Sequence, residues 1–80
     1  MMRNFDIELD ARGLNCPLPI LRAKKSINDL TDGQIIKILA TDPAAINDFT
    51  SFCKQTGNEL LESQEQNGEF MFTIKKSARA

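Results

Sequence analysis

A change of hydrophobic period within the first 40 residues limits this chain to few folds. Phe5, Ile7 and Leu9 alternate with acidic side chains, as in a half-buried strand. Residues 20–30 then place apolar side chains at helical spacing, and residues 35–40 form a β-branched apolar run typical of a central strand. A strand, a helix and a second strand in this order predict a parallel βαβ unit with a right-handed crossover.

A second helix is predicted after residue 41. Asp42 is a typical N-cap residue, Pro43 suits the first helical position, and Gly57 followed by Asn58 ends the helical pattern. Each predicted helix has one apolar face, and the later strands direct alternate apolar side chains inward. The predicted core side chains are Ile20, Ala23, Ile27, Leu30, Ile36, Ile38, Ala40, Ile46, Phe49, Cys53, Phe70, Phe72 and Ile74.

The chain should end in a β-hairpin. Two short strand patterns, around residues 59–65 and 69–75, are joined through Asn67-Gly68, and Asn-Gly is a strong hairpin signal. We therefore predict one domain over residues 1–80 with an α/β fold. It is a two-layer α/β sandwich of order β-α-β-α-β-β, with a four-stranded mixed sheet and two helices on one face.

Composition argues against several classes of function. The chain has 10 basic and 11 acidic residues, a net charge of -1 and no histidine, so it lacks the basic footprint of a nucleic-acid binder. Two cysteines are too few for a disulfide scaffold, and no apolar run is long enough to span a membrane. We expect a cytoplasmic protein with no cofactor, no metal, no direct nucleic-acid partner and no membrane insertion.

Cys16 directly precedes Pro-Leu-Pro. A residue before proline is pushed toward extended geometry, so Cys16 is expected at the N-cap of the first helix or just before it. Pro17 suits the first helical position, and Pro19 in the first turn removes no intrahelical hydrogen bond, so the helix could start at either proline. The two prolines would hold the thiol exposed at the helix N-terminus.

The electrostatic setting of Cys16 is predicted to favour its thiolate. The positive end of the helix dipole lowers the pKa of a cysteine placed there. Arg12 and Arg22 are near enough in sequence to add positive potential. Asp10 and Asp42 would oppose this effect if they approached, so the prediction is a direction only: a lowered pKa for Cys16.

The two cysteines are interpreted differently. Parallel pairing of the first two strands puts the Cys16 loop and the turn at residues 41–43 at one sheet edge, the edge that ligand sites favour. Cys16 could instead fill a gap as a small buried hydrophobe, but Asn15 and the prolines favour an exposed thiol. Cys53 lies on the apolar face of the second helix and is interpreted as a core residue. We expect no disulfide between them, because they should lie at opposite edges.

Residues 9–27, LDARGLNCPLPILRAKKSI, and 40–60, ATDPAAINDFTSFCKQTGNEL, resemble the TusA/SirA family of small sulfur-carrier proteins. The resemblance covers roughly residues 7–62 and rests on Cys-Pro-x-Pro after Gly-Leu, with the ATDP turn and the Phe-Cys pair of the second helix in support. It implies the family fold. It also implies that Cys16 carries a persulfide. The residues that we expect to support Cys16, at the helix N-terminus and in the nearby loop, are Arg12, Gly13, Pro17, Pro19 and Asp42.

The resemblance further implies a sulfurtransferase-type carrier. Such a carrier accepts sulfane sulfur from a donor protein, a cysteine desulfurase or a rhodanese, and passes it to an acceptor protein of a sulfur relay. Branches of the family serve tRNA 2-thiouridine synthesis, sulfur oxidation, thiosulfate use or cofactor assembly. Some relay members have an acidic residue at the position of Leu18, and a histidine is common at the position of Asn58, so the sequence selects no branch.

Two other interpretations remain open. The chain could be a non-catalytic regulatory or protein-interaction module that uses the Cys-Pro-x-Pro loop for docking. It could also be a thiol redox switch, but that role needs a resolving thiol, and Cys53 is expected to be too distant and too buried.

Charged side chains outside the core could contact partners. Arg22, Lys24 and Lys25 form either a docking surface beside Cys16 or an ordinary solvated helix face. Four glutamates are expected to make the end of the molecule away from Cys16 acidic: Glu59, Glu62, Glu65 and Glu69.

The outer face of the sheet should also carry apolar side chains. Ile35 and Leu39 flank Lys37 there, with Met71 and Thr73 nearby. Such a face could take a partner protein or a second copy of the chain. The isolated chain is nevertheless expected to be a monomer.

Overall fold

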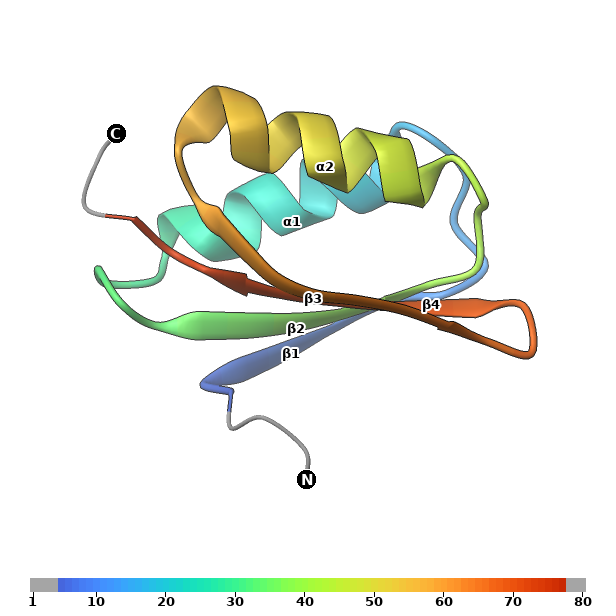
Figure 1. Ribbon diagram of the computed structural model, residues 1–80, viewed down its shortest axis with the longest axis horizontal. Coiled ribbons are helices and arrows are strands. Elements are labelled where there is room, and N and C mark those ends of the chain that lie inside the picture. The colour runs from blue at the N-terminus through green and yellow to red at the C-terminus, as the bar shows by residue number, and fades with distance from the viewer. Residues whose placement is uncertain (1–4, 78–80) are drawn as a thin grey trace.

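Two helices pack on one face of a four-stranded sheet in the computed structural model, which describes residues 5–77 (Figure 1). Within residues 5–77, no helix lies on the other face of the sheet. The elements are β1 (Ile7–Ala11), α1 (Leu18–Asn28), β2 (Ile35–Ala40), α2 (Ala45–Thr56), β3 (Glu59–Gln66) and β4 (Glu69–Lys75). The predicted two-layer α/β fold and its β-α-β-α-β-β order are confirmed.

The strands lie in the order β1-β2-β4-β3. β1 and β2 are parallel, with Ile7 opposite Ile36 and Ala11 opposite Ala40, while β4 is antiparallel to both β2 and β3. The sheet is therefore mixed, and α1 is the crossover that parallel strands require. As a consequence β1 and β2 end at the same edge.

The core lies between the sheet and the two helices. Phe49 of α2 and Phe72 of β4 are fully buried, with ring centroids 4.8 Å apart. Ile46 was predicted inside but is 38% exposed, because Ala45, Phe49 and Phe52 set the inward face of α2 and Ile46 falls on its flank. Ile20 is partly buried against the core. The remaining predicted core side chains are buried: Ala23, Ile27, Leu30, Ile36, Ile38, Ala40, Cys53, Phe70 and Ile74.

Phe5 departs from the predicted strand alternation. β1 begins only at Ile7, and a bend at Asp6 precedes it. The Phe5 ring instead lies below Lys37, whose Nζ is 5.3 Å from the ring centroid, on the face of the sheet opposite the helices. A cation–π contact at the strand entry has replaced burial in the core.

The β3–β4 hairpin has the predicted two-residue turn. Asn67 and Gly68 have φ values of 54° and 81°, respectively. Positive φ at both central residues is the requirement of a type I′ turn, which glycine and asparagine meet at least cost. The Asn-Gly prediction is confirmed.

The packing of α2 gives a stability prediction. Phe49→Ala should lower the free energy of unfolding by about 3–5 kcal/mol, because it removes a fully buried ring and leaves a cavity against Phe72. Ile46→Ala in the same helix should cost clearly less, about 1 kcal/mol, because that side chain is 38% exposed and lies outside the buried core. Urea unfolding followed by circular dichroism measures both, and equal losses would contradict this description of the core.

Candidate functional site

Two hydrogen bonds join the segments that follow β1 and β2. The Gly13 N–H donates to the Thr41 hydroxyl at 2.9 Å, and the Cys16 N–H donates to an Asp42 carboxylate oxygen at 2.6 Å. Each segment leads into a helix, so α1 and α2 begin at the same edge of the molecule (Figure 1). The predicted meeting of the Cys16 loop with the turn at residues 41–43 is confirmed.

Asp42 organises the start of α2 from outside the helix. The helix begins at Ala45 with Ala44 as its N-cap, so the prediction of Asp42 as N-cap and Pro43 as first residue was two residues early. Asp42 Oδ1 accepts the Ala44 N–H at 3.1 Å, and the Asp42 carbonyl accepts the Ala45 N–H at 2.9 Å. This Asx-type turn uses the residues expected in the first helical turn.

The prolines place Cys16 just outside α1. Pro17 is the N-cap, Leu18 the first helical residue and Pro19 the second, so the placement of Pro17 at the first helical position was one residue early. The Pro17 carbonyl accepts the Leu21 N–H at 3.1 Å, which starts the helical ladder. The Cys16–Pro17 peptide bond is cis, and Cys16 is an exposed free cysteine.

Arg12 binds carboxylates. Its Nε and Nη2 donate to the two carboxylate oxygens of Asp10 at 2.9 and 3.0 Å, and its Nη1 lies 3.7 Å from Glu69. These contacts lower the pKa of Asp10 to about 2 and raise the pKa of Arg12. The expectation that Arg12 would add positive potential at Cys16 is therefore wrong. Gly13, at φ +81°, then turns the chain toward Thr41, in a conformation that a side chain would strain.

The glutamates do not gather at the end away from Cys16. Because β4 is antiparallel to β2, the β3–β4 hairpin lies at the edge where β2 ends. Glu69 therefore reaches Arg12 beside the Cys16 loop, and Glu65 of β3 lies near the turn of the same hairpin. Glu59 pairs in register with Lys75 at the opposite edge. The prediction of one acidic end was wrong because it ignored the strand direction.

The pKa of the Cys16 thiol is raised above its ordinary value. The largest cause is a hydrogen bond with the Asp48 side chain, followed by partial desolvation and by the negative charges of Asp48 and Asp42. The predicted lowering was wrong, since Asp48 of α2 and Asp42, which precedes α2, bring two carboxylates to the thiol, and Arg12 is held elsewhere. At neutral pH the resting side chain is thus a thiol rather than a thiolate.

Cys53 has a structural setting. It is 6% exposed in the core cluster, and burial raises its pKa to about 11. Both cysteines are free. Cys53 therefore packs as a small apolar side chain, as predicted.

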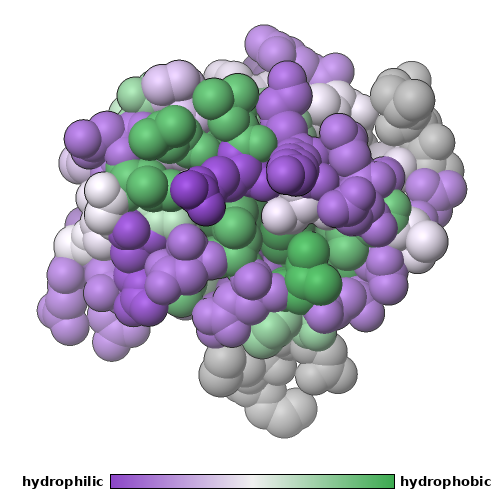
Figure 2. All heavy atoms as spheres, turned by 180° about the vertical axis from the view of Figure 1, so that it is seen from behind, coloured by the Kyte–Doolittle hydropathy of each residue, from purple (hydrophilic) through white to green (hydrophobic). Residues whose placement is uncertain are grey.

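Exposed apolar side chains lie beside Cys16. Leu18 and Leu21, in the first two turns of α1, are 45% and 53% exposed. Figure 2 views the molecule from the side of α1 and β1 and shows apolar surface gathered at the upper left, over the helical layer. Because Leu18 and Leu21 follow Cys16 by two and five residues, the start of α1 offers apolar surface to a protein that approaches the thiol.

Comparison with known proteins agrees with this geometry. The sequence model of the family described as "Sulfurtransferase TusA" matches residues 7–76. The chain is 62% identical over 76 residues to a protein of Allochromatium vinosum named "Sulfur carrier protein TusA", covering 95% of this chain and 100% of the relative. This chain belongs to the TusA family. A Pseudomonas aeruginosa protein of the same name is 41% identical over 78 residues, covering 98% of this chain and 99% of the relative.

A solved structure shares the TusA-family fold of this chain. The crystal structure of a SirA-like protein from Desulfitobacterium hafniense superposes with a TM-score of 0.81 at 28% identity. The superposition covers 90% of this chain and 99% of that one. The likeness extends over both helices and the mixed sheet.

One site residue of this TusA-family chain was missed in the sequence. Asp48 follows Asp42 by six positions, and its place early in α2 puts its carboxylate at the thiol. An acidic residue in the first turn of a helix that starts beside Cys16 was the available signal.

Neither a metal centre nor a membrane span is visible in residues 5–77. That part of the chain holds no group of three or more His, Cys, Asp or Glu residues suited to a metal ion. Its helices are too short and too polar to cross a bilayer.

The carboxylate beside the thiol can be tested. Asp48→Asn should lower the pKa of Cys16 and speed its alkylation by iodoacetamide at pH 7, because the thiolate is the reactive form. The measurement is the alkylation rate as a function of pH, with Asp32→Asn at the opposite sheet edge as control. A profile unchanged by Asp48→Asn would contradict the role given to Asp48.

The Asp42 hydrogen bonds can also be tested. Asp42→Ala should cost about 1–2 kcal/mol of stability, because it frees the Cys16 and Ala44 N–H groups at the two helix starts. Urea unfolding gives the cost, and hydrogen exchange should show faster exchange of the Cys16 amide. Asp32→Ala is the matched control. An exchange rate of the Cys16 amide that Asp42→Ala leaves unchanged would show that this hydrogen bond does not restrain the loop.

Proposed function

We propose that this protein carries sulfane sulfur as a persulfide on Cys16 and passes it to a partner protein. The observation that carries the proposal is the exposed free thiol at the start of α1, in a chain that matches the full length of a protein named as a sulfur carrier. The alternative of a non-catalytic docking module gives the exposed thiol no chemical role.

The transfer needs only thiol chemistry. The Cys16 thiolate attacks the outer sulfur of a donor persulfide, the donor's S–S bond breaks, and the donor sulfur leaves as a thiolate. Cys16 then holds the outer sulfur as Cys–S–SH. An acceptor thiolate attacks that outer sulfur, which returns Cys16 to the thiolate. The sulfane sulfur moves without a net oxidant or reductant, because each S–S bond formed replaces one broken.

The surroundings of Cys16 supply position and restraint. Asp42 holds the Cys16 backbone N–H, Gly13 and Thr41 join the loop to β2, and Pro17 with Pro19 fixes the start of α1. Arg12 supports the loop through Asp10 and Glu69. The raised pKa keeps the unloaded carrier as a thiol, so donor docking must help remove its proton. Asp48, whose carboxylate is the main cause of the raised pKa of Cys16, is the group that we assign to accept that proton.

Donor and acceptor are proteins in this proposal. The donor is a cysteine desulfurase or a rhodanese, the acceptor is a sulfur-relay protein, and both reach Cys16 past Leu18 and Leu21. The chain then acts as a sulfurtransferase only together with those partners, in the cytoplasm, where thiols stay reduced. The final use of the sulfur, in tRNA thiolation or in sulfur or thiosulfate metabolism, depends on the acceptor.

The experiment is whole-protein mass spectrometry after incubation with a cysteine desulfurase and cysteine, or with a rhodanese and thiosulfate. A reductant-labile gain of one sulfur atom is expected in the wild type and in Cys53→Ala, and is expected to be absent in Cys16→Ser. The donor that loads the chain identifies the class of relay.

Two results would overturn the proposal. One is loading of Cys16→Ser to the wild-type level, which would put the sulfur elsewhere. The other is a Cys16 that both donors leave unloaded and that iodoacetamide does not modify in the folded protein. The docking-module interpretation would then take its place.

A further inference from the structure

The start of α1, beside Cys16, offers few of the free backbone N–H groups through which helix N-termini bind anions. Pro17 and Pro19 have no backbone N–H. The Cys16 N–H donates to an Asp42 carboxylate oxygen at 2.6 Å, and the Leu18 N–H donates to the carbonyl three residues before it at 2.8 Å. From Cys16 to Pro19, every backbone N–H is therefore either absent or already paired.

Two carboxylates act on the thiol at this position. Asp42 accepts the Cys16 N–H, and Asp48 is in the first turn of α2. Both side chains are half-buried, so salt screens their charges less than those of fully exposed groups. The negative charges of both residues raise the pKa of Cys16. The electrostatic potential at the sulfur is therefore negative.

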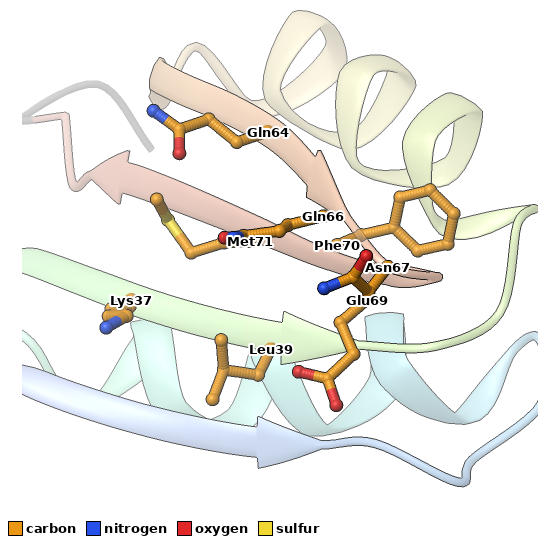
Figure 3. Close-up of a pocket in the computed structure, with 8 residues that line it drawn as sticks. All are labelled: Lys37, Leu39, Gln64, Gln66, Asn67, Glu69, Phe70 and Met71. Carbon is orange, nitrogen blue, oxygen red and sulfur yellow. The ribbon is translucent and has the colours of Figure 1, made fainter.

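The nearby cations do not offset these two charges. Arg12 is bound to Asp10 at 2.9 Å and lies 3.7 Å from Glu69, so one guanidinium faces two carboxylates. Figure 3, a view of the sheet face opposite the helices, shows the Glu69 side chain extending from β4 toward the end of β1, the strand that leads into Arg12. The cations of α1 follow Cys16 by six to nine residues: Arg22, Lys24 and Lys25. The charges that shift the pKa of Cys16 are those of the two carboxylates.

We propose that Asp42 and Asp48 are specificity-determining residues that exclude small anionic sulfur compounds from Cys16. The inference rests on the proposed carrier function and names the class of sulfur source that the site accepts. Small anions such as thiosulfate and glutathione approach the thiol against both carboxylates, with no free N–H group at residues 16–19 to bind them. A donor protein can hold its persulfide in neutral or basic surroundings and so avoids this repulsion. Cys16 therefore takes sulfur from proteins rather than from dissolved anions.

The same charges affect the release of sulfur. A small anionic thiolate that attacked the outer sulfur of Cys–S–SH would take that sulfur and leave Cys16 as a thiolate. Repulsion by Asp42 and Asp48 slows this loss, whereas an acceptor protein can bring a basic side chain to the same carboxylates. The two residues thus favour protein partners in both directions of transfer.

The test uses small disulfides of opposite charge as reagents for the thiol of the full chain. The Cys16 thiolate attacks one sulfur of the reagent, the reagent's S–S bond breaks, and its other half leaves as a thiolate. Cystamine carries two ammonium groups, and dithiodiglycolate carries two carboxylates. Whole-protein mass spectrometry gives the rate for each reagent, with Cys16→Ser as the blank. The ratio of the two rates cancels the ionised fraction of Cys16, so a change in thiol pKa alone leaves the ratio unchanged.

The wild type should prefer cystamine more strongly than the neutral thiol mercaptoethanol does. Asp42→Asn and Asp48→Asn should each lower the ratio roughly twofold to fivefold, the effect of one unit charge a few ångströms away in water. Asparagine keeps an oxygen that can accept the Cys16 N–H, so the loop stays restrained. Raising the salt from about 0.01 M to about 1 M should also lower the wild-type ratio, because the screening length falls from about 30 Å to about 3 Å.

Asp32→Asn makes the same charge change at the opposite sheet edge and should keep the wild-type ratio, and circular dichroism verifies that each variant is folded. Three results would overturn the inference: a wild-type ratio equal to that of mercaptoethanol, a ratio that both Asn variants at the thiol leave unchanged, or an equal loss in Asp32→Asn. No donor protein takes part, so this result is separate from persulfide loading. Loading of Cys16 without charge selectivity would reject the inference and leave the proposed function, whereas selectivity without loading would reject the carrier function.

Discussion

The hydrogen bond from the Cys16 N–H to Asp42 connects the two halves of the helical layer. It is possible only because β1 and β2 are parallel, which brings the ends of both strands to one edge. The same Asp42 carboxylate accepts the Ala44 N–H, so a single side chain sets where α1 and α2 begin. The position of the thiol therefore depends on the pairing of β1 with β2, far from the thiol itself.

Restraint of the Cys16 loop by a carboxylate also affects the ionisation of the thiol. An acidic side chain that restrains the loop also opposes ionisation of the thiol, and Asp48 adds to the effect. A high thiol pKa lowers the thiolate fraction but makes the thiolate that forms a stronger nucleophile. For a carrier, slow reaction with bulk oxidants and fast reaction inside a protein complex are compatible, because a docking partner can change the field at the thiol.

The sequence predicts the fold well and the site only in part. The hydrophobic period, the β-branched runs and the Asn67-Gly68 turn are local signals in the sequence. They are enough to predict the helices and strands and the buried faces of β2 and β4. The predictions for Ile46 and Phe5 were wrong because they depend on tertiary packing. The rotation of α2 about its axis leaves Ile46 partly exposed, and the path of the chain before β1 places Phe5 against Lys37. The pKa of Cys16 was predicted with the wrong sign because it depends on which charges folding brings close. Arg12 is near Cys16 in sequence but bound to Asp10, while Asp48 is distant in sequence and yet is the main cause of the raised pKa of Cys16.

The separation of the two cysteines determines how a loaded chain can lose its sulfur. Cys53 is buried late in α2, whereas Cys16 is exposed before the start of α1, and the chain has no third thiol. The persulfide proposed for Cys16 would therefore not be discharged by closing an internal disulfide, the route open to proteins with a neighbouring resolving cysteine. Release of the sulfur then requires an encounter with another molecule. The lifetime of the cargo is governed by collision partners rather than by the chain's own motions.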